Sequence, residues 1–513
     1  MALIRSAATV GAYTLASRML GLLRDILIAK YLGAGMVGDA FFVALKLPNL
    51  FRRLFAEGAF NLAFVPLFAG RIESEGRGPA RAFAEDALAV LLWTLVAVTI
   101  VAEIAMPWLM YAFAPGFAAD AAKFELAVAL TRLTFPYLLM ISLVALLGGV
   151  LNSIERFAAA ASAPILLNLC LIAGLLLFGR RLATPGHALA WAVAVAGIAQ
   201  FLWLAWSCRR AGLLPALPRP RLTPAVRKLL RVMAPAAVGA GVQQLNLFVD
   251  VIIASLLPTG AVSFLYYADR VVQLPLGVIG VALGTALLPA LARLERAGDG
   301  GAAANAQSRA IEVAMLLTLP AAAALMTVAG PVITVLFQRG AFGAADSAAT
   351  AGALAAFAFG LPAYVLIKVL APGYFARGDT RTPLKVAVAC LVVNAALNLI
   401  LMVPLAHVGI ALASALSSWL NVALLGIGLA RRGHLSLDAR LRARLPRTLA
   451  AAAVMAGCLW LAAGLVAPWL AAGLAVKVGA LAALIGLGLA VFAVAAQASG
   501  AMRLAEVATL LRK

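Results

Sequence analysis

Arginines are the residues in this sequence whose type and spacing fit the most defined chemistry. Arg18, Arg24, Arg52 and Arg53 lie within two long apolar stretches, at residues 7–32 and 38–69. An arginine at the middle of a membrane-spanning helix costs about 2.5–3.5 kcal/mol against lipid, so such a side chain faces the protein interior and is a functional candidate. The planar guanidinium fork grips phosphate oxygens in pairs. These arginines therefore predict a site for a phosphate or pyrophosphate group.

Polar residues accompany the arginines of the first stretch at helical spacing. Residues seven apart on an ideal helix lie on nearly the same face. This spacing places Arg18 with Asp25, and Ser17 with Arg24. The first stretch is therefore expected to present one polar wall.

The second stretch repeats this pattern. Asp39, Lys46 and Arg53 follow the same seven-residue step, and Glu57 lies one turn beyond Arg53. Arg52 lies off this face. A helix with a proline can rotate its downstream part, so the spacing does not choose between Arg52 and Arg53.

Composition places these stretches in a membrane. The chain has 513 residues, of which 65% are hydrophobic and 12% charged, and its mean hydropathy is +1.03. Such values exclude a soluble domain of this length. Apolar runs near the ~20 residues that a bilayer requires predict an all-α polytopic membrane protein with about 14 spans. We expect these spans at 7–32, 38–69, 84–111, 124–151, 158–179, 187–207, 228–257, 262–291, 309–337, 346–376, 383–404, 407–430, 447–468 and 473–497.

The net charge of +21 follows from the loops. Basic residues gather in alternate loops, for instance around Arg209–Arg231 and Arg431–Arg447. The side richer in lysine and arginine is cytoplasmic, so both termini are expected in the cytoplasm. Topology and anionic lipid therefore account for the basic charge, and no nucleic-acid partner is expected.

Polar and proline landmarks recur in the second half at an offset of about 225 residues. The recurring pairs are Asp25 and Asp250, Gly35 and Gly260, Lys46 and Arg270, Pro136 and Pro362, and Asn168 and Asn394. Six spans in each half predict two parallel repeats, which in transporters enclose a central cavity near the midplane and work by alternating access. The expected domains are bundles at 1–210 and 228–435, a basic cytoplasmic linker at 211–227, and an appended helix pair at 436–513.

The repeat also predicts a cation from the second half. Asp269-Arg270 corresponds to Leu45-Lys46, so both halves are expected to aim cations at one cavity. The alternative is that the charges snorkel to the membrane surface or form pairs within one helix. Those pairs would be Arg24–Asp25, Arg53–Glu57 and Asp269–Arg270.

Several motifs resemble the MurJ/MviN family of lipid II flippases from the first span to the last. The most specific is Arg52-Arg53-Leu54-Phe55-Ala56-Glu57-Gly58. The others are Ser17-Arg18 with Gly21 and Arg24-Asp25, Asp39-Ala40-Phe41, Tyr267-Ala268-Asp269-Arg270, Phe337-Gln338-Arg339-Gly340, and Thr380-Arg381-Thr382-Pro383.

The resemblance implies a fold of the multidrug/oligosaccharidyl-lipid/polysaccharide exporter superfamily with fourteen helices. It further implies transport of lipid II, an undecaprenyl-pyrophosphate-linked peptidoglycan precursor, across the bacterial cytoplasmic (inner) membrane from the inner to the outer leaflet. No bond is made or broken, so neither an enzyme nor a cofactor is expected. Cell-wall synthesis machinery is a possible partner.

The resemblance also assigns residues. Arg18, Arg24, Arg52 and Arg270 are the implied substrate-binding residues, which favours Arg52 over Arg53, with Asp39 and Glu57 in support. The last two helices are expected to form a hydrophobic groove for the isoprenoid tail.

A monovalent-cation site is a further expectation. Asp250, Asn394, Asn398 and Ser414 could hold Na⁺ through oxygen atoms, as in some relatives. The alternative is hydrogen bonding between helices, because three of these four ligands are neutral.

Other functions compete with this prediction. The nearest is a flippase for another polyprenyl-pyrophosphate-linked glycan, which would share the phosphate chemistry. A cation or drug antiporter of the same fold would need an acidic cavity. A membrane enzyme would need clustered catalytic or metal-binding residues, and a structural scaffold would tolerate loss of the arginines.

Overall fold

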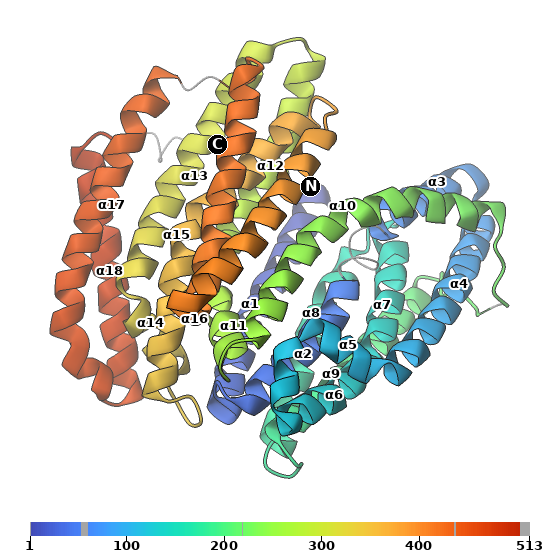
Figure 1. Ribbon diagram of the computed structural model, residues 1–513. Helices are drawn as coiled ribbons and strands as arrows, with labels where there is room; N and C mark the ends of the chain where they lie inside the picture. Colours follow the sequence, from blue (N-terminus) through green and yellow to red (C-terminus); the bar gives the residue numbers. More distant parts are fainter. Residues whose placement is uncertain (1, 53–59, 218, 436–437, 503–513) are drawn as a thin grey trace. The chain divides into compact units, whose positions relative to one another are not determined.

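The computed structural model describes residues 2–52, 60–217, 219–435 and 438–502, which form helices and short loops without a β-strand (Figure 1). The chain divides into two compact units, Met1–Ser263 and Phe264–Lys513. Each unit is built from long helices joined by short turns, and each is described by itself below.

The first unit holds the helices up to α10, followed by a short loop. Its elements are α1 (Ala2–Leu32), α2 (Met36–Phe51), α3 (Asn61–Glu75), α4 (Arg77–Ile104), α5 (Met106–Phe113), the 3₁₀ turn η2 (Pro115–Ala119), α6 (Ala121–Thr134), α7 (Tyr137–Asn152), α8 (Phe157–Phe178), α9 (Pro185–Arg210) and α10 (Pro224–Ser255). Helix α8 packs between α1 and α9, and α9 also contacts α7, α6 and α2.

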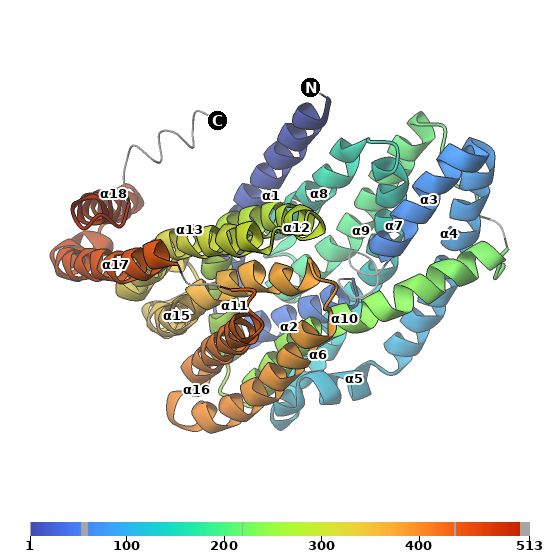
Figure 2. The ribbon, with the colours of Figure 1, turned by 90° about the horizontal axis from the view of Figure 1, so that it is seen from above.

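The second unit begins within α11 (Ala261–Pro275). It continues with the π-helical turn η3 (Leu276–Gly280), α12 (Val281–Arg296), α13 (Gly300–Thr327), α14 (Ala329–Phe337), α15 (Ala344–Phe375), α16 (Arg381–Arg431), α17 (Ala439–Val466), the 3₁₀ turn η4 (Ala467–Ala471) and α18 (Leu474–Ala498). Helix α15 is its core and contacts α12, α13, α14 and α16. Helix α17 packs on α13, and α18 packs on α17 (Figure 2).

The predicted class, an all-helical membrane protein, is confirmed. Among the described residues, nine helical segments are long and apolar enough to cross a bilayer. Apolar side chains on the outward faces remain exposed, such as Trp460 at 70% and Leu465 at 79%. In a membrane protein these faces contact lipid, because the apolar lipid tails solvate apolar side chains better than water does.

Prolines divide some of the expected spans but not others. Pro136 lies at the break between α6 and α7, and Pro275 ends α11 at the π-helical turn. Helix α15 instead runs through Pro362 without interruption. A proline removes one backbone hydrogen bond, which neighbouring helices compensate, so a membrane helix does not have to break at it.

Helix α16 is too long for one bilayer crossing. Its 51 residues contain one non-helical position, Ala406, with φ 47° and ψ −129°. A bilayer core of about 30 Å needs only ~20 helical residues, so the break separates two lengths that can each span it. This position lies between the expected spans 383–404 and 407–430. Close by, a Cβ atom on Gly409 would lie 2.2 Å from the carbonyl oxygen of Leu401, so this turn requires glycine.

Candidate functional site

Arg24 is the centre of a polar network between α1 and α8, which pack side by side (Figure 1). Its Nε and Nη2 atoms donate to Oδ1 of Asp25 at 2.9 and 2.8 Å, and its Nη1 donates to Oδ1 of Asn168 at 2.9 Å. The Asn168 amide donates to the backbone oxygen of Ser17 at 3.0 Å. The Arg24 and Asp25 side chains are 11% and 4% exposed. The network thus holds a guanidinium in a fixed orientation inside the bundle.

The Asn168 amide lies beside Gly21 of α1. A Cβ atom on Gly21 would lie 3.8 and 3.9 Å from the two polar atoms of this amide, which is ordinary van der Waals contact. Asn168 itself is 4% exposed. A buried amide needs partners for both its donor and its acceptor, and Ser17 and Arg24 supply them.

The other predicted cations of the first unit have different surroundings. Arg18 is partly exposed and makes no hydrogen bond or ion pair with any residue that the structure describes. Arg52 follows the last residue of α2, and its Nε donates to Oδ1 of Asn49 at 3.1 Å. Lys46 is partly buried on the same helix. Arg53 and Glu57 lie outside the described residues.

Asp39 is a fully buried carboxylate, with 1% exposure. Lys123 Nζ lies 2.8 Å from its Oδ2 atom. Oδ2 also accepts from the backbone N–H of Gly260 at 2.7 Å, and Oδ1 accepts from the backbone N–H and hydroxyl of Ser263 at 2.9 and 2.6 Å. The carboxylate therefore binds the backbone at the beginning of α11, where a negative charge stabilises the helix N-terminus.

Lys123 is positioned for this contact by its own helix end. Asp120 accepts a hydrogen bond from the backbone N–H of Lys123 and begins α6 there. The Lys123 ammonium also donates to Thr259 at 3.2 Å and lies 4.2 Å from the Phe117 ring centroid. A Cβ atom on Gly38 would lie 2.9 Å from the Ser263 hydroxyl, so glycine is needed beside the Asp39 network.

In the second unit, Arg270 lies on α11 with its guanidinium carbon 4.7 Å from the Tyr266 ring centroid. Asp269 accepts from Gln273 at 3.2 Å. Both residues are partly buried. The predicted meeting of Arg270 with the arginines of the first unit in one cavity stays a prediction.

Three of the four expected cation ligands lie in the second unit, on the two halves of α16. Asn394 and Asn398 are completely buried, and Ser414 is 8% exposed. The Ser417 hydroxyl, one turn after Ser414, donates to Oδ1 of Asn394 at 3.4 Å. The fourth residue, Asp250, lies on α10 of the first unit. The sodium site and its alternative, hydrogen bonding between helices, both stay predictions.

The sequence reasoning missed Lys123 and Ser263 in these networks, and it did not recognise the role of Asn168. Lys123 was not singled out, although a lysine at the edge of an apolar span is itself a signal of a buried partner. Asn168 was recognised only as the repeat counterpart of Asn394. The repeat could have identified Asn168 as a functional candidate, because its counterpart Asn394 was proposed as a cation ligand.

The fold defines a class, a polytopic α-helical membrane protein. A solved multidrug transporter of the MATE family and MOP superfamily in an inward-facing conformation is similar over 83% of this chain and 98% of its own, at 16% identity and a TM-score of 0.69. A structure described as "Lipid II flippase MurJ, inward closed conformation" covers 95% of this chain and 98% of its own, at 23% identity and a TM-score of 0.80.

Sequence comparison narrows the class to a family. The family model for the lipid II flippase MurJ matches residues 28–480. A probable lipid II flippase MurJ from Rhizobium tropici is 46% identical over 97% of this chain and 94% of its own length. The lipid II flippase MurJ from Burkholderia cenocepacia is 39% identical over 84% and 85%. The chain belongs to the MurJ family of lipid II flippases.

Proposed function

We propose that this protein moves lipid II from the inner to the outer leaflet of the bacterial cytoplasmic membrane. The family match along 28–480 carries this proposal, because it covers most of the chain, including Arg52 and Arg270. This is a transport function: the protein moves a lipid-linked substrate from one leaflet of the membrane to the other, and no covalent bond is made or broken.

The proposed substrate-binding group is the pyrophosphate, held by Arg18, Arg24, Arg52 and Arg270. Arg24 supports this role best, because Asp25 and Asn168 orient its guanidinium within the bundle. Arg18 supports it further, since its charge makes no ion pair with any described residue. An oriented guanidinium and a second arginine that forms no ion pair among the described residues together suit a doubly charged group.

The proposed topology has fourteen spans with both termini in the cytoplasm. The break at Ala406 supports two spans within α16. The helix pairs α4–α5, α6–α7 and α13–α14 each match one expected span. The two bundles at 1–210 and 228–435 would alternate access to the arginines, and the final pair α17–α18 would offer its apolar faces to the isoprenoid tail.

The decisive experiment is transport of lipid II by the purified protein in vesicles, read as head-group accessibility from outside. Arg18→Ala, Arg24→Ala and Arg270→Ala should each lower the rate at least tenfold, and should fail to replace the flippase in depleted cells. Arg209→Ala, which removes an exposed charge at the end of α9, is the matched control. If all three variants transport at the wild-type rate, the pyrophosphate mechanism is wrong.

The same vesicles separate the nearest alternative. A flippase for another polyprenyl-pyrophosphate-linked glycan would use the same arginines and prefer a different head group. Lipid II and a second polyprenyl-pyrophosphate glycan are therefore compared at equal concentration. Faster transport of the second lipid would overturn the substrate assignment and leave the arginine mechanism in place.

A further inference from the structure

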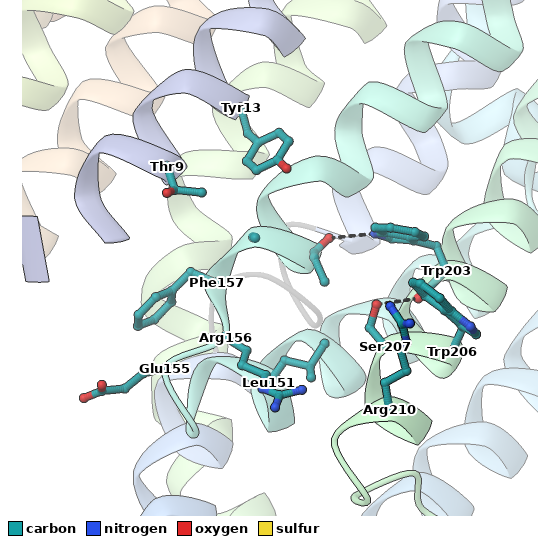
Figure 3. Close-up of a pocket in the computed structure, with 12 residues that line it drawn as sticks. Thr9, Tyr13, Leu151, Glu155, Arg156, Phe157, Trp203, Trp206, Ser207 and Arg210 are labelled. Carbon is teal, nitrogen blue, oxygen red and sulfur yellow. Dashed lines mark hydrogen bonds between the residues drawn. The ribbon is translucent and has the colours of Figure 1, made fainter. Parts of the chain in front are cut away.

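A cavity of about 500 Å³ lies in the first unit, apart from the candidate arginines (Figure 3). Its walls come from the start of α1, the turn between α7 and α8, and the last turns of α9. Cavities of this size accept small ligands or a lipid head group. Its residues have no part in the proposed pyrophosphate site.

One wall of the cavity is aromatic and fixed by hydrogen bonds. The Trp203 and Trp206 rings stack with centroids 5.3 Å apart. The Trp203 indole N–H donates to the carbonyl oxygen of Ala159 at 3.2 Å and to the Ser162 hydroxyl at 3.0 Å. Figure 3 shows both indoles on one side of the cavity, facing Tyr13 of α1 across it. The wall therefore presents a rigid amphipathic surface.

Two arginines contribute positive charge. Arg210 lies with its guanidinium carbon 4.4 Å from the Trp206 ring centroid, which holds its side chain against the wall. Arg156 lines the cavity from the turn before α8. The one carboxylate of the lining, Glu155, lies on the side away from the tryptophans (Figure 3). The lining thus has two cations and one anion, and favours an anionic ligand.

The position of the cavity along the helices indicates a membrane interface. Arg210 is the last residue of α9, and Arg156 directly precedes α8. The two cations of the lining therefore lie where these helices leave the apolar layer. Tryptophan concentrates at this depth, and arginine there meets lipid phosphates. In the proposed topology this interface faces the cytoplasm, which is the leaflet richer in anionic lipid.

We propose that this cavity binds the head group of an anionic phospholipid. Arg156 and Arg210 donate to its phosphate, and the two tryptophans pack along its glycerol backbone and upper acyl chains. The inference goes beyond the proposed transport function, because the ligand is a membrane lipid and the residues are separate from the candidate arginines. The same helix, α1, forms one wall of this cavity and carries Arg24.

The test measures lipid binding by the purified full chain in detergent. Phosphatidylglycerol with a fluorescent acyl chain is titrated, and its anisotropy is followed. The Arg156→Gln/Arg210→Gln double variant should bind it about tenfold more weakly, because charge-assisted contacts to phosphate are lost. The control is Arg209→Gln/Arg231→Gln, which removes the same charge from exposed positions outside the lining and should bind like the wild type.

Competition then identifies the ligand. Unlabelled phosphatidylglycerol should displace the probe, while phosphatidylcholine and soluble glycerol phosphate should compete at least tenfold more weakly. Equal affinity of the two double variants would overturn the proposal, since charge alone would then explain binding. Full displacement by glycerol phosphate would overturn it in favour of a free-anion site. Transport is not measured, so failure of this proposal is distinct from failure of the flippase assignment.

Discussion

Arg24 and Asp39 show how one kind of residue, a charge within a membrane bundle, can be held in two ways. The Arg24 guanidinium donates to the carboxylate of the adjacent residue Asp25 and to the neutral amide of Asn168 on another helix. The Asp39 carboxylate pairs with a lysine on another helix and accepts from two backbone N–H groups at the start of α11. In both cases the cost of burial is offset by hydrogen bonds that satisfy most of the charged atoms.

Asn168→Ala should destabilise the first unit and misalign Arg24. A hydrogen bond to a charged group contributes about 1.5–3 kcal/mol, and the alanine leaves Nη1 without this acceptor. We expect a lower melting temperature in detergent and slower lipid II transport. Asn305→Ala, at an exposed position of α13, is the matched control and should change neither. Wild-type stability and transport for Asn168→Ala would contradict a role in orienting Arg24.

Lys123→Met should be among the most destabilising single changes in the first unit. Removing one partner of a buried ion pair costs about 3–5 kcal/mol, because the remaining charge stays buried. The melting temperature in detergent measures the loss, and Lys123→Met/Asp39→Asn should recover part of it. Lys228→Met, at an exposed position, serves as control. Independent, additive effects at 123 and 39 would show that the two side chains are not coupled.

Individual helices owe their geometry to a few backbone positions. The two halves of α16 meet at Ala406, and the chain folds back closely enough that Gly409 approaches the backbone of Leu401. By contrast, α15 is straight enough to remain one helix despite Pro362 and Pro372. Such differences arise from packing against neighbours, because the local sequence contains proline in both helices.

Gly409→Ala should therefore destabilise the second unit. The new methyl group would lie 2.2 Å from the Leu401 carbonyl oxygen, and forcing the backbone apart costs about 1–3 kcal/mol. Gly426→Ala on the same helix has no atom within 4 Å of the new Cβ and is the control. It should be neutral or stabilise by up to ~1 kcal/mol, as expected for alanine in a helix. Equal melting temperatures for both variants would refute the close approach.

The loop after α16 contains His434, whose protonation should make the stability of the protein depend on pH. Burial, with Arg377 and Arg432 nearby, lowers the pKa of His434, and Glu295 opposes this shift. The unfolded chain then binds more protons, so stability falls as pH drops through the ordinary histidine pKa near 6.5 and levels off below the folded pKa. Between pH 7.5 and 5.5, the melting temperature of His434→Gln should therefore fall less than that of the wild type.

A second histidine variant makes that comparison specific. His187→Gln, which removes a histidine from the first unit, is the comparison variant. The prediction fails if His434→Gln and the wild type lose the same melting temperature over this pH interval. Both measurements use the full chain in the same detergent.

The sequence predicts elements better than it predicts contacts between them. Apolar runs located most helices, and the proposed spans on either side of Ala406 coincide with the two halves of α16. The Arg24–Asp25 pair was foreseen as an alternative because both residues are adjacent in the chain. The pairing of Asp39 with Lys123 and Ser263 was not, since it joins positions far apart in sequence and no local pattern encodes such proximity.

At the scale of the whole molecule, the proposed topology makes a direct prediction. In a variant with Cys170, Cys208, Cys390 and Cys458 replaced by serine, Arg181→Cys should react with a membrane-impermeant thiol reagent added outside the cell. Asp299→Cys should react only after the membrane is opened, because its loop belongs to the basic, cytoplasmic side. The reverse labelling pattern would invert the proposed orientation.

In the proposed mechanism, the network around Arg24 would make pyrophosphate binding an exchange of one anion for another. The guanidinium already holds a carboxylate oxygen of Asp25 through two N–H groups. A pyrophosphate bound there as proposed would displace this carboxylate, and the net free energy would be the difference between two strong contacts. Asp25, which is adjacent to Arg24 in the chain, would then re-form its contact as the substrate leaves. A carrier built on such competition favours rapid turnover over tight retention of its cargo.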